Sequence, residues 1–456
     1  MKRLIAALAL LLLMFGVLGP TPAAAISYEL SLIIPNPAPA DFDRFGEHAV
    51  DAVGSMILVG ARWDDTGATD AGTVYSFDGS TGELLQVIPN PMPAYKDYFG
   101  GKITALGNHM AAAAENDDEG RTNAGAVYLY ELDGSTWVDP KTYLSPSPAT
   151  YDSFGRSLAL MEHSLLGKLL VVGEPMDNYP AENSGAFYVF SLSDDEWWRI
   201  DNPYPEVGEF FGIGVAGLGD RILAGGHGDS TALDDTSIHN AGAAFLFEFN
   251  EPEWKWDLYL PLLNPDPDID DHFGLSVANV GDNKALVGAR GEDTGATNAG
   301  AAYLFDASTG ALLPRDATLN PTPGDNDLFG DEDGVAAVGD NFLVGAGFDD
   351  DETGVSNAGA AYLFDGDPLS PAFGDLLWTF TSPTPTTNDF FGYYVAGMGD
   401  KVILSALGED IVDPDTGVVY TDAGAVYVFD VPEPSTLVLL SIAAIGLLLY
   451  ALRKRR

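Results

Sequence analysis

The chain has 456 residues, of which 46% are hydrophobic, and it contains 52 glycines and 29 prolines; this composition argues against disorder and supports a large core with many turns. Its 68 acidic residues outnumber the 21 Lys and Arg, and the formal net charge of −47 repels nucleic acid and anionic lipid headgroups while attracting cations. There is no cysteine, so stability has to come from the core or from bound ions and not from disulfides.

The N-terminus has the three parts of a secretory signal peptide. Lys2 and Arg3 precede an apolar run over residues 4–18, and the small residues Ala23-Ala24-Ala25 follow it. We therefore expect residues 1–25 to be removed during export. The alternative interpretation of the same segment is an uncleaved membrane anchor.

A sevenfold repeat follows the leader. Each copy opens with an acidic residue two positions before Phe-Gly, and the copies are 54 to 62 residues apart: Phe45, Phe99, Phe154, Phe211, Phe273, Phe329 and Phe391. A partner motif of the Asn-Ala-Gly type also occurs seven times, with its glycine at Gly72, Gly125, Gly185, Gly242, Gly300, Gly359 and Gly424. Such a period is typical of repeat units that cannot bury their apolar face alone.

Each copy contains four strand patterns. In the copy at residues 271–305, two apolar segments flank the Gly281-Asp282 turn, which predicts a hairpin. A third strand with aromatic residues ends at Phe305, and fourth strands resemble residues 83–88 of the first copy. Four strands in each of seven copies, without an amphipathic helix, predict an all-β fold: a seven-bladed β-propeller over residues 26–430.

The two ends of the array complement each other. The seventh copy ends at residues 427–429 without a fourth strand, whereas residues 28–34 have a fourth-strand pattern without a copy of their own. We expect residues 28–34 to complete the seventh blade and close the ring, which leaves no open sheet edge. The alternative is an open solenoid.

A Pro-x-Pro signature lies between each fourth strand and the next Phe-Gly. Its first residue is Asn or Ser, at Asn36, Asn90, Ser145, Asn202, Asn264, Asn320 and Ser382. Proline ends a strand ladder and fixes φ, so we predict a structural role in the step from blade to blade.

These motifs together resemble the FG-GAP repeats of the integrin α-subunit head and its bacterial relatives. The resemblance rests on Phe-Gly, on strands ending in Val-Gly-Ala such as Val59-Gly60-Ala61, and on Ala-Gly-Ala-x-Tyr. It implies a seven-bladed propeller with an adhesive or scaffolding role. Many family members carry a D-x-D-x-D-G calcium loop in the first hairpin, but here a bare Gly-Asp turn stands there, too short to surround a cation.

Acidic residues gather in two classes of loop that should leave the blades on the same face. For the acid two positions before Phe-Gly we favour a turn role, with the carboxylate accepting backbone N–H bonds. The loops after the second strand carry acidic pairs, whose oxygens suit Ca²⁺, with a solvated rim as the alternative. The candidate metal ligands are Asp64, Asp65, Asp117, Asp118, Glu292, Asp293, Asp349 and Asp350, and further pairs stand at 234–235 and 409–410.

No catalytic constellation stands out in the sequence. The six histidines show no H-E-x-x-H pairing, and no G-x-S-x-G or phosphate-binding glycine loop occurs. Five tryptophans near the turns between third and fourth strands could stack on sugars or pack the outer strands: Trp137, Trp197, Trp198, Trp254 and Trp256. We expect a protein that is not an enzyme.

The C-terminus carries a second address. Pro432-Glu433-Pro434 precedes an apolar run over residues 436–452 and the basic tail Arg453-Lys454-Arg455-Arg456. The run is long enough for a short transmembrane helix, and positive charge after it places the tail in the cytoplasm. Residues 431–456 closely resemble the PEP-CTERM sorting signal, which implies an inner-membrane-anchored precursor, recognition by an exosortase-type transpeptidase, and delivery to the cell surface or extracellular matrix.

The sequence thus predicts an exported, non-catalytic interaction or adhesion propeller, with Ca²⁺ as a candidate cofactor and a surface protein or polysaccharide as partner. A polysaccharide-binding or polysaccharide-cleaving enzyme is the alternative.

Overall fold

The computed structural model describes residues 28–194, 196–229, 239–281, 283–313, 318–350, 353–414 and 416–430. Within it, Leu30–Asp430 forms one compact unit. Outside the described residues lie the predicted leader 1–25, the sorting segment with Pro432, Glu433 and Pro434, its basic residues Arg453, Lys454, Arg455 and Arg456, and the acidic pair at 234–235. The described part holds no helix of the length and apolarity that a membrane crossing requires.

Seven four-stranded sheets form the blades in the described ranges. Blades one to three consist of β2 (Val50–Val53), β3 (Met56–Ala61), β4 (Thr73–Asp78) and β5 (Leu84–Pro89); β6 (Phe99–Leu106), β7 (His109–Ala114), β8 (Ala126–Asp133) and β9 (Thr136–Leu144); and β10 (Ser157–His163), β11 (Gly167–Glu174), β12 (Ala186–Ser191) and β13 (Trp197–Asp201).

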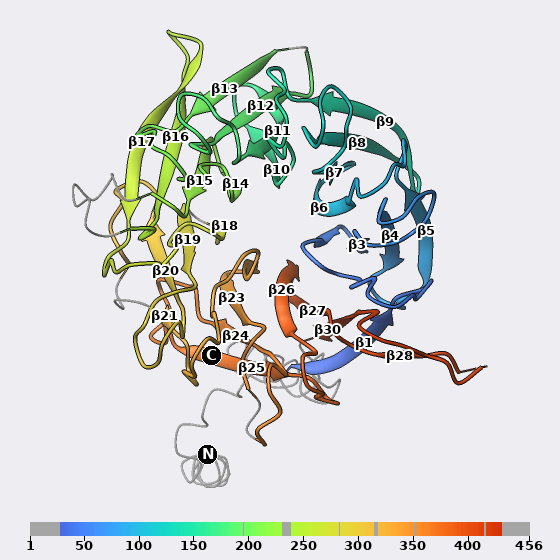
Figure 1. Ribbon diagram of the computed structural model, residues 1–456. Helices are drawn as coiled ribbons and strands as arrows, with labels where there is room; N and C mark the ends of the chain where they lie inside the picture. Colours follow the sequence, from blue (N-terminus) through green and yellow to red (C-terminus); the bar gives the residue numbers. More distant parts are fainter. Residues whose placement is uncertain are drawn as a thin grey trace, which may run out of the picture. The chain divides into compact units, whose positions relative to one another are not determined.

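Blades four to six have the same order. They consist of β14 (Val215–Leu218), β15 (Arg221–Gly226), β16 (Ala243–Asn250) and β17 (Lys255–Leu263); β18 (Val277–Asn279), β19 (Lys284–Ala289), β20 (Ala301–Asp306) and the short β21 (Thr318–Leu319); and β22 (Val335–Val338), β23 (Asn341–Ala346), β24 (Ala360–Phe364) and β25 (Leu376–Thr381). The first strand of each blade faces the axis and the fourth lies outside (Figure 1).

The seventh blade joins the two ends of the unit. Its sheet runs in the order β26 (Phe391–Met398), β27 (Lys401–Ala406), β30 (Ala425–Asp430) and β1 (Glu29–Pro35). The Ser31 hydroxyl donates a hydrogen bond to the Val428 carbonyl at 3.0 Å. The prediction that residues 28–34 complete the last blade is confirmed, and the ring is a closed seven-bladed β-propeller.

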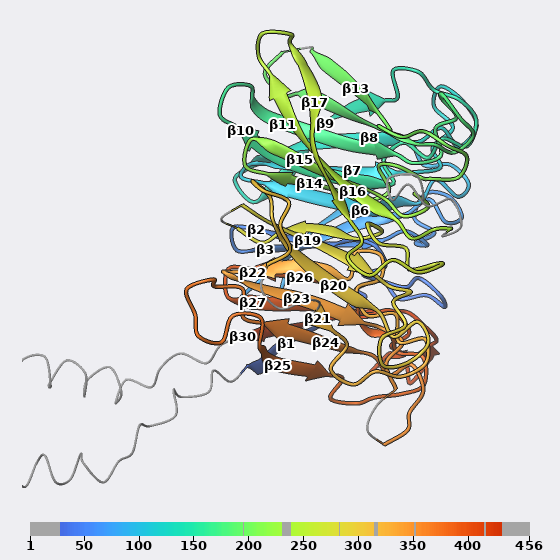
Figure 2. The same cartoon turned by 90° about the vertical axis from the view of Figure 1, so that its left-hand side faces the viewer.

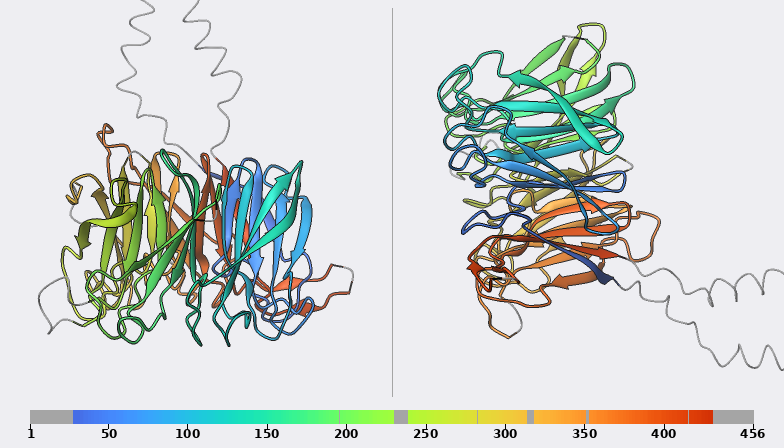
Figure 3. Two further views of the ribbon diagram at one scale, coloured as in Figure 1. Left: turned by 90° about the horizontal axis from the view of Figure 1, so that it is seen from above. Right: turned by 90° about the vertical axis from the view of Figure 1, so that its right-hand side faces the viewer.

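The core lies in the seams between neighbouring blades. The middle strands β3 and β4 are buried almost throughout, because each sheet packs on both faces, whereas the outer β5 exposes most of its side chains. One hydrophobic cluster joins Phe45 and Val59 of blade one to Ile403 and Val428 of blade seven. The edge-on views show neighbouring sheets stacked in this way (Figures 2 and 3).

The repeated motifs are the seam itself. In every seam the Phe-Gly phenylalanine donates its backbone N–H to the residue before the partner glycine, at 2.8 to 3.1 Å. Gly72, at φ +85°, approaches blade two so closely that a Cβ atom there would lie 2.0 Å from the Phe99 carbonyl oxygen. Phe-Gly and Ala-Gly therefore recur because each blade needs both to dock on its neighbours.

One element departs from the repeat. A two-stranded hairpin, β28 (Ile411–Val412) with β29 (Val419–Tyr420), is inserted between β27 and β30. Its residues match nothing in the other copies, which is why the repeat pattern did not predict it.

Candidate functional site

The two acidic loop classes meet on one face of the ring. In blade one, the backbone N–H of Lys96 and Tyr98, in the crossing to blade two, donate to the carbonyls of Thr69 and Asp70 in the loop after β3, at 2.9 and 3.2 Å. We call the face formed by these crossings and loops the loop face. The predicted juxtaposition is confirmed.

The acid two positions before Phe-Gly anchors the Pro-x-Pro crossing. Asp97 is buried, and it accepts hydrogen bonds from the Asn90 side-chain amide at 2.9 Å and from the Ala94 N–H at 2.6 Å. The same pair of bonds recurs at Asp43, Glu209, Asp271 and Asp327. The predicted bond to a backbone N–H is present, although its donor lies three residues earlier in the chain than the acid.

The turn in which a side-chain oxygen accepts the backbone N–H two residues on, an Asx-type turn, is made by the first residue of the Pro-x-Pro signature and not by the acid before Phe-Gly. The first residue of each Pro-x-Pro signature accepts the N–H two positions on, as Asn90 does from Met92 at 3.0 Å. Sequence reasoning missed this role, although the recurring Asn or Ser before proline was its visible signal. The signature therefore acts as a rigid crossing, in line with the predicted structural role.

The acidic pairs divide into a buried and an exposed residue. The first acid, such as Asp64, is buried and accepts a hydrogen bond from the hydroxyl of a tyrosine on the third strand, here Tyr75 at 2.6 Å. Equivalent bonds join Asp117 to Tyr128 at 2.8 Å, Glu292 to Tyr303 at 3.0 Å, and Asp349 to Tyr362. The second acid lies on the surface and accepts a backbone N–H of its own loop: Asp65, Asp118, Asp293 and Asp350.

Burial raises the pKa of several carboxylates on the loop face. Burial raises the pKa of Asp43 to about 7, against the lowering effect of the Ala40 N–H, and the charge of Asp64 adds to the rise. Burial likewise raises the pKa of Asp271 and of Asp349 to about 6. Since a tyrosine hydroxyl already bonds Asp64, Asp117, Glu292 and Asp349, Ca²⁺ binding by these four pairs stays a prediction.

The turns that hold calcium in FG-GAP relatives are too short here. Between β2 and β3, Val53 pairs with Met56, which leaves a two-residue turn, and β6–β7, β14–β15, β22–β23 and β26–β27 are the same. These described hairpins do not fit a cation that needs six to eight oxygen ligands.

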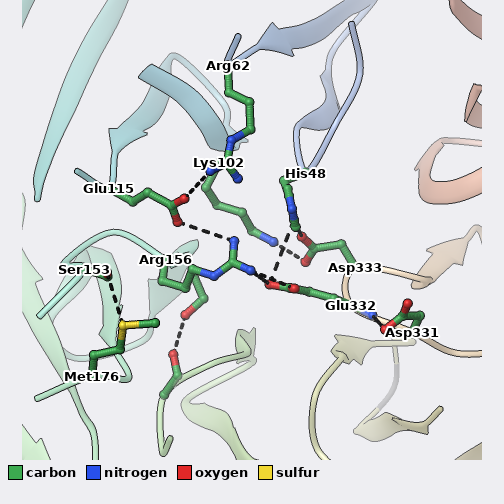
Figure 4. Close-up of polar contacts among 12 residues, drawn as sticks. His48, Arg62, Lys102, Glu115, Ser153, Arg156, Met176, Asp331, Glu332 and Asp333 are labelled. Atoms are coloured by element: carbon green, nitrogen blue, oxygen red, sulfur yellow. Dashed lines mark hydrogen bonds and ion pairs between the residues drawn. The ribbon is translucent and has the colours of Figure 1, made fainter. Parts of the chain in front are cut away.

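Charged side chains from several blades meet at the axis (Figure 4). Arg62 contacts Glu115 at 2.6 Å, and Arg156 contacts Glu115 at 3.4 Å and Glu332 at 2.7 Å. Lys102 pairs with Asp333. Blades two and three are thus tied to blade six across the ring.

This axial cluster is electrostatically satisfied. Burial alone would raise the pKa of Glu115, but the guanidinium groups of Arg62 and Arg156 outweigh it and lower the pKa to about 2. His48 lies 3.9 and 3.8 Å from Glu332 and Asp333, which Arg156 and Lys102 already neutralise. Sequence reasoning missed the cluster, whose residues stand within three positions after Phe-Gly or directly after the second strand, where the copies differ from one another.

Some of the five tryptophans pack inside the protein, and others are exposed and available for stacking. Trp137 and Trp256 are buried in the cores, whereas Trp197 and Trp254 are 49% and 48% exposed. The Trp198 indole N–H donates to the Trp254 carbonyl at 3.1 Å, which links the outer strands of blades three and four.

Comparison with known proteins identifies two family patterns in the chain. The FG-GAP repeat model matches residues 256–305, and the PEP-CTERM protein-sorting motif matches residues 430–456. The first match runs from the fourth strand of blade four to the third strand of blade five, so it spans one complete seam. The resemblances that the sequence suggested are confirmed, and the sorting motif marks an exported, membrane-processed protein and implies an exosortase system.

Solved structures support the architecture. The WD40 repeats of RRP9 superpose with a TM-score of 0.52 at 11% identity, covering 88% of this chain and 99% of that one. U3-55K gives a TM-score of 0.51 at 11% identity, covering 89% and 99%. At this identity the likeness concerns the propeller fold alone. No curated protein matches the sequence.

Proposed function

We propose that the chain is a surface or matrix protein whose propeller works as a non-catalytic interaction or adhesion module, with the loop face as its binding surface. The observation that carries the proposal is the construction of this face. Buried acids and Pro-x-Pro crossings fix the loops, and exposed acids such as Asp65 and Asp118 project from them. The sorting motif at 430–456 supports display outside the cell.

A face of this charge favours a cationic partner. Complementary charge accelerates encounter and sets orientation, and its effect weakens with salt. The partner class is therefore a basic surface on another exported protein, or an anionic polysaccharide bridged through divalent cations.

The binding test uses four charge-neutral, nearly isosteric changes on the loop face. The full chain with Asp65→Asn, Asp118→Asn, Asp293→Asn and Asp350→Asn keeps the loop-capping oxygens and loses four negative charges. We expect at least about tenfold weaker retention on a cationic surface or on cell-surface extract at low salt.

The matched control neutralises four exposed acids at or near the turns on the face opposite the loop face, and so loses the same number of negative charges: Glu83, Asp133, Glu251 and Glu253. If both quadruple variants lose retention equally, net charge alone governs binding and the loop face is not the site. If neither loses it, the proposal fails.

Sorting is tested by the mass of the mature protein. In cells that contain an exosortase system, we expect the mature chain to lack residues 1–25 and the segment beyond the Pro432–Pro434 motif. A chain that keeps residues 435–456 outside the inner membrane would contradict this route.

The exposed Trp197 and Trp254 favour a second candidate, polysaccharide binding or cleavage. A glycan array and a reducing-sugar assay, with Trp197→Ala and Trp254→Ala as variants, separate the two functions. Sugar binding that both variants abolish would favour this candidate over the loop face.

A further inference from the structure

Blade three departs from the other blades at one buried position. Glu174 ends β11 opposite Ala186, where the second strands of the other blades end in small residues: Ala61, Ala114, Gly226, Ala289, Ala346 and Ala406. The Glu174 side chain is 0% exposed. A carboxylate has therefore replaced a methyl group or a hydrogen inside a packed seam, which is unfavourable unless something compensates the charge.

Two neighbouring acids point at the same spot. Asp152 precedes Phe154-Gly155, and Asp177 is the first acid of the loop after β11; both are buried. Oxygen atoms of Asp152, Glu174 and Asp177 all lie within 4.8 Å of one another. The cluster therefore combines the two buried acids that other blades also have, one before Phe-Gly and one in the loop after the second strand, with a third carboxylate.

The third carboxylate lacks a donor. No hydrogen bond of good geometry reaches either oxygen of Glu174 or Oδ1 of Asp152, although the Asp177 carboxylate lies beside Glu174. Ser145 replaces the asparagine that serves this acid in five other blades, and its hydroxyl lies beside Glu174 without forming a hydrogen bond of good geometry. In blade seven, which also begins its crossing with serine, the Thr386 hydroxyl donates to Asp389 at 2.5 Å, but blade three has Ala149 at that position.

The net charge of the cluster suits a divalent cation. Arg199 donates to both oxygens of Asp177, at 2.8 and 2.9 Å, so one guanidinium and the three carboxylates, once all are ionised, carry a net charge of −2. Without an ion, burial raises the pKa of Glu174 to about 9 and favours its protonated form. The axial cluster differs, because its acids already face lysine and arginine. A pocket of about 450 Å³ lined by Asp152, Asp177 and Arg199 opens beside the cluster.

We propose that Asp152, Glu174 and Asp177 bind one Ca²⁺ ion inside blade three. Ca–O distances of about 2.3–2.6 Å allow ligand oxygens on one ion to lie up to about 5 Å apart, which the spacing of these oxygens satisfies. The Ser145 hydroxyl and water complete the shell. The ion ties the crossing before Phe154 to the end of β11 and to the following loop. The site lies on the loop-face side of blade three but includes none of the acidic pairs predicted as metal ligands, and it does not depend on the proposed function.

Glu174→Ala is the decisive variant, because it gives blade three the residue that most other blades carry and so preserves the fold. Equilibrium dialysis of the full chain in detergent should find one Ca²⁺ fewer in Glu174→Ala than in the wild type. Glu174→Gln should weaken that site at least about tenfold. The matched control Asp133→Asn, exposed at the end of β8 in blade two, should keep it.

Melting temperature supplies the second readout. A chelator should lower that of the wild type and leave that of Glu174→Ala unchanged, and Glu174→Ala should melt higher than the wild type in chelator because the uncompensated carboxylate is gone. Equal Ca²⁺ uptake by wild type and Glu174→Ala, or none by the wild type, would overturn the proposal. In the second case Glu174 is a buried, protonated acid.

Discussion

At the scale of single residues, the repeated glycines are the most sharply defined requirement of this fold. A left-handed backbone is one part of that requirement, and the closeness of the next blade is the other. Blade one offers a way to separate them, because Gly54 and Gly72 both have positive φ but differ in surroundings: nothing lies within 4 Å of a Cβ atom at Gly54.

We predict that Gly54→Ala lowers the free energy of unfolding by about 1–2 kcal/mol, the cost of the left-handed conformation. Gly72→Ala should cost at least about 3 kcal/mol, because its Cβ atom would also collide with the Phe99 carbonyl. Thermal and denaturant melts of the two variants measure the difference. Equal losses would mean that the seam tolerates a methyl group and that backbone conformation alone selects glycine.

The buried acids of the loop face predict a pH dependence. Burial raises the pKa of folded Asp43 to about 7, above the value of about 3.9 for an unfolded aspartate. The folded protein therefore holds this proton more tightly; the resulting stabilisation is complete below pH 3.9 and is lost as the pH rises to about 7. In chelator, the melting temperature should fall between pH 5 and pH 8, and Asp43→Asn should reduce the fall by about 2 °C.

Glu83→Gln, which removes a carboxylate charge at an exposed position in the turn before β5, is the control for this experiment. It should leave the pH dependence as it is in the wild type. A wild-type protein that melts higher at pH 8 than at pH 5 would contradict the assignment of Asp43 as a buried, proton-holding group.

At the scale of elements, the connections determine the loop face more than the strands do. The Pro-x-Pro crossing is rigid because its first residue bonds the acid before Phe-Gly, as Asn90 does to Asp97 at 2.9 Å, and because its prolines fix φ. Strand-forming residues fix the blades; the crossings set the distance and angle from one blade to the next.

Asn90→Ala tests this role. It removes a donor to buried Asp97 and the acceptor for the Met92 N–H, so we predict a loss of about 1–3 kcal/mol in the free energy of unfolding. Asn90→Ser, the residue found in blades three and seven, should recover part of it. Hydrogen exchange at residues 92–98 should speed up in the alanine variant before it does in β4; uniform exchange changes across blade one would instead indicate a general loss of packing.

Sequence periodicity predicted the elements well because each strand alternates or runs apolar in register with its six counterparts. It could not predict β28–β29, which occurs once, or β21, reduced to two residues. The sequence could not distinguish the two acids of a pair, since nothing in Asp64-Asp65 reveals that one side chain points inward to Tyr75. Glu174 could not be singled out from the sequence, because its departure from the small residue of the other copies appears only when the copies are aligned by strand register.

At the scale of the whole molecule, the ring is held by two kinds of long-range contact: the pairing of β1 with β30 and the ion pairs at the axis. Counting fourth strands was enough to predict closure by residues 28–34, because an array with one missing strand and one spare strand has a single simple solution. The axial ion pairs of Arg156 with Glu332 and Lys102 with Asp333 had no such signal. They join residues far apart in sequence at the positions where the copies are least alike.

Closure gives the last prediction. Ile34 is 1% exposed, and β1 covers the edge of β30, so a chain processed to begin at residue 36 should lose about 5 kcal/mol or more in the free energy of unfolding. The bared β30 edge should also pair between molecules, giving a concentration-dependent dimer by size-exclusion chromatography. A chain that begins at residue 28 keeps β1 and should behave as the wild type. Added peptide 28–35 should restore the monomer and raise the melting temperature, because it supplies the missing strand in trans. If the shortened chain stays monomeric with an unchanged melting temperature, β1 is not what closes the ring.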